Sequence, residues 1–143
     1  MEIVNLPAGD PRWAAALPVL QQLRTHLGAD DLTEVLASDA QRPSFFAAFE
    51  GDVCLGVCGW RVIANTSAGR KLYVDDLVTA DSVRSQGVGA ALLEHAEEIA
   101  RRHRCGVLDL DSGVQRHAAH RFYLRERLDI VSFHFAESLQ IDE

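Results

Sequence analysis

The stretch Tyr73-Val-Asp-Asp-Leu-Val-Thr79, followed after a short spacer by Arg84-Ser-Gln-Gly-Val-Gly-Ala-Ala-Leu-Leu93, decides the fold of this chain. An apolar strand pattern runs into a loop, and the loop opens a long helix with two glycines at its start. Gly87 and Gly89 remove side chains there, and the first N–H groups of a helix have no partner within the helix. The positive end of the helix dipole lies behind them, so the pattern predicts a site for phosphate oxygens, with Arg84 adding charge at its entrance.

A glycine-containing helix start with a surface arginine is the simpler interpretation of the same residues. Other phosphate-binding motifs do not fit the sequence. A Walker loop needs Gly-Lys, whereas Lys71 follows Arg70, and a dinucleotide fingerprint needs a third glycine where Leu92 stands. A hydrolase elbow of the form G-x-S-x-G is also missing from the sequence. The function therefore depends on what surrounds the two glycines.

The elements on either side of this stretch predict the fold class. Upstream we expect a strand over Glu2–Leu6, a helix over Pro11–Leu27, a short helix capped by Asp30 or Asp31 and ending at Ala37, and strands over Ser44–Glu50, Val53–Ile63 and Lys71–Thr79. Downstream we expect a helix over Val88–His103, a strand over Gly106–Leu110, a helix over Arg116–Arg127 and a strand over Ile130–Ala136. The order β-α-α-β-β-β-α-β-α-β predicts an α+β fold with a mixed sheet, antiparallel first and then a β-α-β crossover, in one domain spanning residues 1–143.

Composition and charge exclude several classes of protein. A chain of 143 residues with 48% hydrophobic and 24% charged residues can build a core without disulfides. No apolar run reaches the ~18–20 residues that a membrane helix needs, and the first ten residues lack the basic start of a secretory signal. The net charge of −7 argues against a nucleic-acid binder. We therefore expect neither a nucleic acid nor a membrane as partner.

The three cysteines, Cys54, Cys58 and Cys105, indicate reduced thiols in a cytoplasmic protein. Cys54 and Cys58 lie four apart in a predicted strand, which puts both on one face and too far apart for a comfortable disulfide. A zinc site needs more cysteines and histidines at tighter spacing. We expect no metal.

The quoted stretch resembles the acetyl-CoA signature of the GNAT superfamily of N-acetyltransferases, centred on Arg84-x-x-Gly87-x-Gly89. Further along, Ala119-His-Arg-Phe-Tyr123 is similar to the second motif of that family, and the resemblance covers roughly residues 44–137. Two positions depart from the family pattern. Arg116 stands where the family has Asn, and Arg127 stands where it often has a Gly that ends the helix in a left-handed conformation. A left-handed Arg costs about 1 kcal/mol relative to Gly, so we expect this helix to end differently.

The resemblance implies a GNAT-like fold and an acetyl-CoA-dependent reaction, with the cofactor in a wedge where the strands ending near Thr79 and Leu110 splay apart. The acetyl group would pass to a primary amine of a small molecule or peptide by direct attack on the thioester. The residues implied for the pantetheine and the acetyl carbonyl are Leu77, Val78 and Thr79. Those implied for the pyrophosphate are Arg84, Ser85, Gln86, Gly87, Val88, Gly89 and Ala90, and those of the second motif are Arg116, Ala119 and Phe122.

The reaction also needs an acid and a base. The resemblance implies that Tyr123 protonates the departing thiolate. Asp75 and Asp76 are candidate bases, and because they are adjacent in a strand we expect them to point to opposite faces, so that only one faces the substrate. Glu50 is a further candidate, and a water relay without a single base is the alternative. His117 and His120 lie on the predicted helix that carries Tyr123. They either relay a proton or have only a surface or packing role.

A different class of function stays open beside the enzyme, namely a non-catalytic acyl-CoA-binding sensor or partner module. Release of CoA in the presence of amines would discriminate the two. Acceptor specificity is expected from residues 23–39, from the Asn65–Gly69 loop and from the chain after Tyr123. The carboxylates of Asp30, Asp31 and Glu34 favour a cationic acceptor.

The predicted final strand also indicates a homodimer. Residues Ile130–Ala136 alternate large apolar and polar side chains, and the strand would lie at or near a sheet edge, where an uncovered apolar strand invites pairing. Phe45 and Trp60 on earlier strands would add apolar surface. Closed two-fold pairing is the commonest assembly of such proteins.

Overall fold

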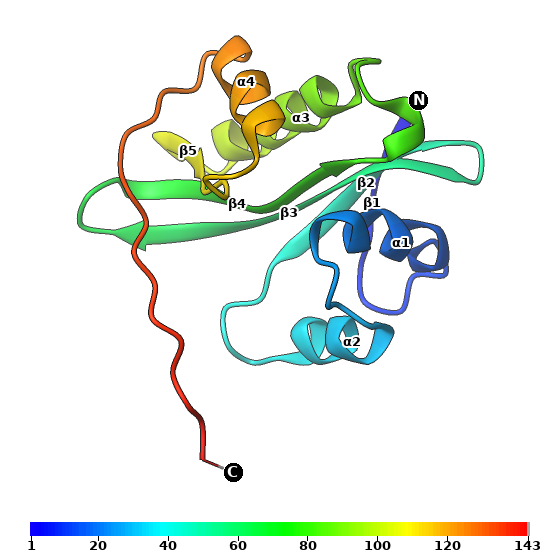
Figure 1. Cartoon of the computed structure of the whole chain (residues 1–143), viewed down its shortest axis with the longest axis horizontal. Coiled ribbons are helices and arrows are strands. Elements are labelled where there is room, and N and C mark those ends of the chain that lie inside the picture. The colour runs from blue at the N-terminus through cyan, green and yellow to red at the C-terminus, as the bar shows by residue number, and fades with distance from the viewer. Residues whose placement is uncertain (143) are drawn as a thin grey trace. The chain divides into compact units, whose positions relative to one another are not determined.

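A computed structural model describes residues 1–142 and divides the chain into two compact units, Met1–Leu110 and a second unit that begins at Asp111 (Figure 1). The first unit contains one five-stranded sheet in the order β1-β2-β3-β4-β5. Its strands are β1 (Glu2–Asn5), β2 (Ser44–Glu50), β3 (Val53–Asn65), β4 (Gly69–Thr79) and β5 (Val107–Leu110). The first four pair antiparallel with their neighbours and β5 joins β4 in parallel, so the predicted mixed sheet is confirmed.

Helices cover both faces of this sheet. They are α1 (Trp13–Leu23), α2 (Ala29–Ala37), the short 3-10 helix η1 (Asp81–Val83) and α3 (Val88–Arg102). At the start of α2, Asp31 Oδ2 accepts a hydrogen bond of 2.8 Å from the N–H of Gly28. Asp31, one of the two predicted capping residues, therefore stabilises the start of α2 from within its first turn, while Gly28 is the N-cap residue. None of the helices in residues 1–142 is both long and apolar enough to cross a membrane.

The apolar side chains of β2 alternate between two layers. Phe45 is buried against Trp13 of α1, with ring centroids 5.1 Å apart. Phe46 is buried on the opposite face, where its ring lies 4.5 Å from that of His95 in α3. The prediction that Phe45 adds apolar surface is therefore wrong, because α1 covers it. Trp60 stays partly exposed beside His103.

A β-bulge in β3 separates the two cysteines of that strand. The register pairs Phe49 with Cys54 and Ala48 with Gly56, so Leu55 is an extra residue and the alternation of faces shifts there. Cys54 consequently packs in the core beneath α1, whereas Cys58 lies opposite Phe46 on the α3 face. The prediction that both cysteines share a face is wrong, although all three cysteines are free thiols as expected.

Helix α3 packs through a regular apolar stripe. Val88, Leu92, Ala96 and Ile99 are buried on one face of the helix, which confirms the helix predicted over this stretch. At one point α3 approaches the sheet closely, because a Cβ on Gly56 would lie 2.8 Å from Leu92 Cδ1. Glycine at this position allows the helix to sit directly on the strand.

The second unit contains α4 (His117–Arg125), and its end corrects an expectation. Arg127 adopts a left-handed conformation with φ of 68°. The N–H of Leu128 donates to the carbonyl of Tyr123 at 3.0 Å, and the N–H of Arg127 donates to that of Leu124 at 3.1 Å. These two bonds form a Schellman motif, the helix ending in which the left-handed position is usually a glycine. Arg127 adopts this conformation instead, and its side chain makes the conformation strained.

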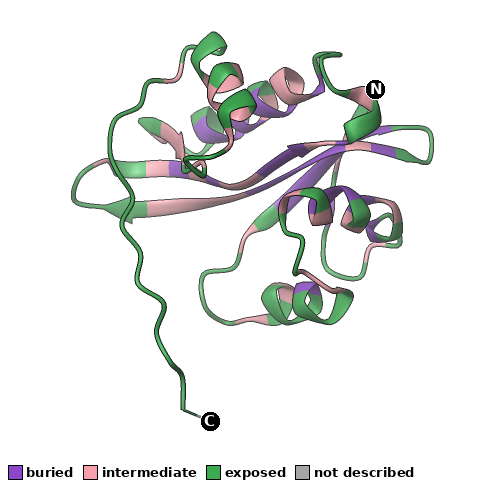
Figure 2. Ribbon diagram, viewed as in Figure 1, coloured by how far each residue is buried: buried purple, intermediate pink, exposed green. Residues whose placement is uncertain are grey.

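The predicted final strand is wrong. Residues 128–142 form no helix or strand, and from Ile130 onward the large apolar side chains are exposed (Figure 2). Alternation gives a segment a preference for extended structure, but a strand exists only when its backbone pairs with another one. Within residues 1–142 the sheet ends at β5, and the last predicted element is an unpaired extended segment.

Candidate active site

The loop between η1 and α3 leaves the helix N-terminus open. Gly87 is the N-cap of α3 with φ of 84°, and Ser85 also has a positive φ of 65°. A Cβ added to Gly87 would meet nothing within 4 Å. A ligand can therefore approach the backbone here, and the left-handed glycine sets the direction in which α3 begins.

This N-terminus is suited to an anion. A left-handed residue followed by a helical one, here Gly87 and Val88, makes successive backbone N–H groups converge on one point. In the part of the chain that the structure describes, α3 has neither a side-chain cap nor an acidic residue in its first turn. Arg84 holds Asp81 at 2.6 Å, but both side chains are about two-thirds exposed, at 68% and 66%. Such a pair is worth little, so the guanidinium can exchange Asp81 for a phosphate oxygen.

The strand that leads to this loop has a free edge. Pairing between β4 and β5 covers only Lys71–Val74 and Val107–Leu110, while β4 continues to Thr79 and stays paired to β3. On the side of β5, the backbone of Leu77–Thr79 therefore has no neighbouring strand in the described sheet. The pairing stops because β5 ends at Leu110, opposite Val74, and the expected splaying of the two strands stays a prediction.

A second bulge changes where the two candidate bases point. Gly59 pairs with Asp76 and Trp60 pairs with Val74, so Asp75 is the extra residue. Asp76 lies on the α1 face of the sheet, beside Gly59, where Arg24 binds it. Asp75 binds Arg61, which is paired with Tyr73 and also lies on the α1 face. The prediction of opposite faces is wrong, because the bulge turns both carboxylates to one face.

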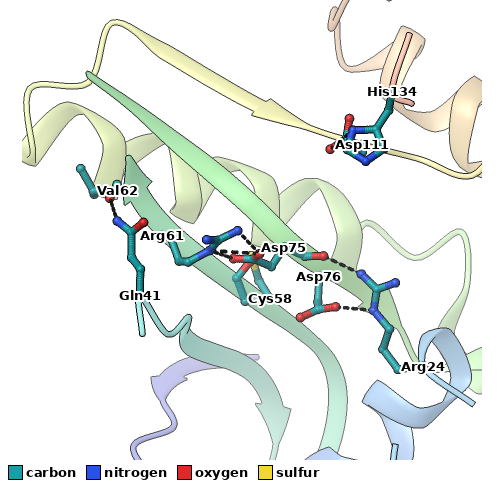
Figure 3. Close-up of polar contacts among 10 residues, drawn as sticks. Arg24, Gln41, Cys58, Arg61, Val62, Asp75, Asp76, Asp111 and His134 are labelled. Atoms are coloured by element: carbon teal, nitrogen blue, oxygen red, sulfur yellow. Dashed lines mark hydrogen bonds and ion pairs between the residues drawn. The ribbon is translucent and has the colours of Figure 1, made fainter. Parts of the chain in front are cut away.

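Two arginines hold these carboxylates (Figure 3). Arg61 donates to both oxygens of Asp75, with Nη2 2.7 Å from Oδ1 and Nε 2.9 Å from Oδ2. Arg24, at the end of α1, donates through Nε to Asp76 Oδ1 at 2.7 Å and through Nη2 to the backbone carbonyl of Asp75 at 2.8 Å. Neither arginine was predicted, because both contacts join segments far apart in the sequence.

The two carboxylates differ as possible bases. Asp75 uses both oxygens for one guanidinium, whereas Asp76 binds Arg24 through Oδ1 and its Oδ2 lies over Gly59. The Asp76 side chain is only 12% exposed. Burial raises the pKa of Asp76 above that of an exposed carboxyl, although the hydrogen bond from Arg24 opposes this. Asp76 is therefore our first candidate for the base, because burial raises its pKa and its Oδ2 lies outside the Arg24 bond.

Cys58 is fully buried on the opposite face of the sheet from the two carboxylates, opposite Phe46. Burial, together with the charges of Asp76 and Asp75, raises the pKa of the Cys58 thiol far above its usual range. A thiol that stays protonated is a poor nucleophile. The site therefore favours direct transfer over an acyl group carried on this cysteine.

Glu50 lies away from this group, at the end of β2 with β3 between it and β4. It binds the N-terminal ammonium of Met1 at 2.8 Å and its side chain is 69% exposed. The ammonium lowers the pKa of Glu50. These contacts indicate a surface ion pair.

A further ion pair on the sheet was missed from the sequence. Lys71 Nζ lies 2.9 Å from Asp109 Oδ2 on β5. Arg61 and Lys71 also lie over the ring of Tyr73, at 5.4 and 5.5 Å from its centroid. Only the contact of Lys71 with Tyr73 had a signal in the sequence: the two residues are two positions apart in a strand, which places both on one face.

The second unit positions the residues of the other motif on α4. The rings of Phe122 and Tyr123 are 5.4 Å apart, and Arg116 is the N-cap residue. His120 Nε2 lies 2.7 Å from the carbonyl of Gly113, which fixes the start of the helix. This contact favours a structural role for His120. The catalytic role of Tyr123 and the cofactor roles of Arg116, Ala119 and Phe122 stay predictions.

Comparison with known proteins places this arrangement in a family. The model of the acetyltransferase (GNAT) family matches residues 13–128. The chain is 36% identical over 113 residues to the uncharacterized N-acetyltransferase YhdJ of Bacillus subtilis, covering 78% of this chain and 80% of that protein. The chain therefore belongs to the GNAT acetyltransferase family and is an N-acetyltransferase.

Two further similarities are more distant. The chain is 38% identical over 66 residues to the aminoalkylphosphonate N-acetyltransferase of Salmonella typhimurium, which covers 46% of this chain and 43% of that protein. An aminoglycoside acetyltransferase from an uncultured soil metagenomic sample has the same fold, with a TM-score of 0.79 at 16% identity over 97% of this chain and 96% of that one.

Proposed function

We propose that this protein transfers an acetyl group from acetyl-CoA to a primary amine of a small molecule or peptide. One observation carries the proposal: the unpaired edge of β4 leads through η1 to the open N-terminus of α3, with left-handed Gly87. The first feature suits a pyrophosphate, and the second suits an extended chain that carries amide groups.

The residues divide this binding between them. The backbone from Arg84 to Ala90, with the Arg84 guanidinium, would hold the pyrophosphate. The backbone of Leu77, Val78 and Thr79 would pair with the pantetheine arm and with the acetyl carbonyl. When bound, acetyl-CoA supplies an activated thioester, and an N–H of this strand edge would stabilise the negative charge that develops on its carbonyl oxygen.

The chemical step needs two proton movements. The amine nitrogen forms a bond to the carbonyl carbon, the carbon–sulfur bond breaks, and the sulfur leaves with the electron pair. Asp76 is our candidate to accept the proton of the amine, directly or through water, because its Oδ2 is outside the Arg24 bond and burial raises its pKa. Asp75 is the second candidate. Tyr123 would give a proton to the departing thiolate.

Two chemical classes of amine are candidates for the acetyl acceptor. The partial relative that acts on aminoalkylphosphonates makes an amine with an anionic group one class to test. A cationic acceptor is a second class, supported by the exposed carboxylates of Asp30 and Glu34 on α2. Asp31 is partly engaged, since it binds the N–H of Gly28.

The test is release of CoA from acetyl-CoA in the presence of amines. The panel contains aminoalkylphosphonates, polyamines, aminoglycosides, amino acids and peptides, with a reaction lacking amine as the control. We expect amine-dependent release with one acceptor class, and a mass increase of one acetyl group on that amine. Tight binding of acetyl-CoA with no release for any amine would instead indicate the alternative, a non-catalytic acyl-CoA sensor or partner module.

We also propose a cytoplasmic location and a homodimer. Free thiols at Cys54, Cys58 and Cys105 support the first, because disulfides are rare in that compartment. The exposed apolar residues of the C-terminal segment support the second. Fractionation of cells and light scattering of the purified protein test these two statements separately.

A further inference from the structure

The last turn of α1 contacts the chain on both sides of the unpaired edge of β4. Before this edge, Arg24 at the end of α1 binds Asp76. After it, the N–H of Asp81 donates a hydrogen bond of 3.1 Å to Gln22 Oε1. The backbone N–H of Arg24 also donates back into α1, at 2.9 Å. The guanidinium of Arg24 therefore reaches β4 from a helix end that is itself anchored.

Arg24 contacts β4 at the bulge, where the regular strand pairing is interrupted. Its Nη2 lies 2.8 Å from the carbonyl oxygen of Asp75, the extra residue of the bulge, and its Nε lies 2.7 Å from Asp76 Oδ1 (Figure 3). An extra residue in a bulge is left out of the strand ladder, so its carbonyl needs a donor from elsewhere. One guanidinium thus fixes the backbone of one aspartate and the carboxylate of the next.

The space over Gly59 gives the Asp76 carboxylate its second support. A Cβ on Gly59 would lie 3.0 Å from Asp76 Oδ2 and 2.6 Å from Phe45 Cε1, so a larger residue there would displace the carboxylate. Asp76 consequently has one oxygen on Arg24 and the other over Gly59, and its side chain is only 12% exposed. The direction of this carboxylate is set by a glycine of β3 and an arginine of α1.

The charges around Asp76 make Arg24 the group that opposes its protonation. Arg24 comes from α1, Asp75 lies beside Asp76 on β4, and Arg61 of β3 binds Asp75 through both carboxylate oxygens. Burial raises the pKa of Asp76 and the charge of Asp75 adds to this, whereas the hydrogen bond and the charge of Arg24 lower it. Without Arg24, burial and Asp75 would act unopposed, and Asp76 would keep its proton to higher pH.

We propose that Arg24 is a positioning residue for the acetyl transfer: it holds the carboxylate of Asp76, and the bulge beside it, in one orientation next to a fixed positive charge. The inference rests on the proposed function, because it takes Asp76 as the base. It adds to that function a residue from α1, a helix that neither of the two sequence motifs contains. Arg24 acts through Asp76, so we expect its loss to change the rate of transfer and its pH dependence rather than the binding of acetyl-CoA.

Two variants of the full chain separate the charge of Arg24 from its orienting contacts. Arg24→Gln removes the positive charge, and Arg24→Lys keeps the charge but loses the planar fork that makes both bonds. Arg12→Gln is the matched control, because Arg12 also binds a carboxylate and a backbone carbonyl, those of Asp10 and Asn5, at the other end of α1. The measurements are the pH dependence of kcat and kcat/KM with the accepted amine, acetyl-CoA affinity by calorimetry, and a carboxyl NMR titration of Asp76.

We expect Arg24→Gln to move the acid limb of kcat/KM, and the NMR titration of Asp76, to higher pH. Arg24→Lys should keep both close to their native positions and lower kcat about tenfold, part of the roughly 10²-fold or more that a positioned base contributes. Arg12→Gln should behave like the native protein in every measurement. All three variants should bind acetyl-CoA with native affinity, which also shows that their fold is intact.

An Asp76 titration that is the same in the native protein and in folded Arg24→Gln would overturn the inference, and so would a native kcat in Arg24→Lys. If Arg24→Gln does not fold, the kcat of Arg24→Lys decides alone. The native protein separates this inference from the proposed function. Release of no CoA with any amine refutes the function, whereas amine-dependent release with Arg24 variants that behave like Arg12→Gln refutes the inference and leaves the function standing.

Discussion

At the scale of single residues, the proposed acid is the most direct link between sequence and reaction. Tyr123→Phe keeps the ring, and thus the contact with Phe122, but removes the proton. We expect turnover to fall on the order of 10²-fold, the effect of losing one general acid, with acetyl-CoA affinity nearly unchanged. The measurement is steady-state and single-turnover kinetics with the accepted amine. Unchanged turnover under conditions where chemistry limits the rate would remove Tyr123 from this role.

The raised pKa of Asp76 gives a pH dependence with a defined sign. Because burial raises this pKa, the folded protein keeps the proton at pH values where the unfolded chain has already lost it. Stability from this group is therefore lost as pH rises through the interval that starts at about 4, the ordinary value for Asp. In urea unfolding we expect the free energy of unfolding of the native protein to decline over this interval relative to Asp76→Asn.

Asp10 provides the matched control for that measurement. Hydrogen bonds from the Arg12 side chain and backbone lower its pKa to about 2. Its contribution is present above about 4 and is lost as pH falls, so Asp10→Asn should change the slope in the opposite sense. The bond from Arg24 is already included in the net pKa shift of Asp76, so the comparison uses the sign of the slope and not the height of the curve. If Asp76→Asn and Asp10→Asn alter the slope in the same direction, the burial argument for Asp76 fails.

At the scale of elements, the end of α4 stores strain that can be released. Arg127 has a positive φ, and a left-handed conformation suits glycine better than any residue with a Cβ. Arg127→Gly should therefore raise the free energy of unfolding by roughly 1 kcal/mol. Arg125→Gly, inside the same helix, should lower it by about as much. Urea denaturation checks both, and a destabilised Arg127→Gly protein would show that the arginine side chain contributes more than the strain costs.

The elements also show how far the sequence could predict the sheet. Alternation and turn residues predicted β2 at its observed bounds and the start of β3, and the sequence also predicted the start of α3 at Val88. They could not predict the two bulges, because an extra residue at Leu55 or Asp75 depends on the neighbouring strand rather than on local pattern. These single-residue insertions explain both wrong predictions of side-chain direction, namely that the two cysteines of β3 share a face and that the two aspartates point to opposite faces.

At the scale of the whole molecule, the glycine-rich helix start was predictable and its surroundings were only partly so. Gly87 is left-handed and open, as a phosphate site requires, and this follows from local sequence. The arginines that hold Asp75 and Asp76 come from other elements, so no local pattern identifies them. The C-terminal segment has strand alternation without a strand, since a strand also needs a neighbouring backbone to pair with.

The measurement that tests the central claim most directly is calorimetric titration of acetyl-CoA into the native protein and into Gly89→Val. Gly106→Val is the control, because a Cβ at Gly106 meets nothing within 4 Å and lies before β5 rather than at the start of α3. If the pyrophosphate binds at the start of α3, the native protein and the control bind acetyl-CoA alike, and Gly89→Val loses at least about tenfold in affinity, or about 1.4 kcal/mol. Undiminished affinity in a folded Gly89→Val protein would contradict the account.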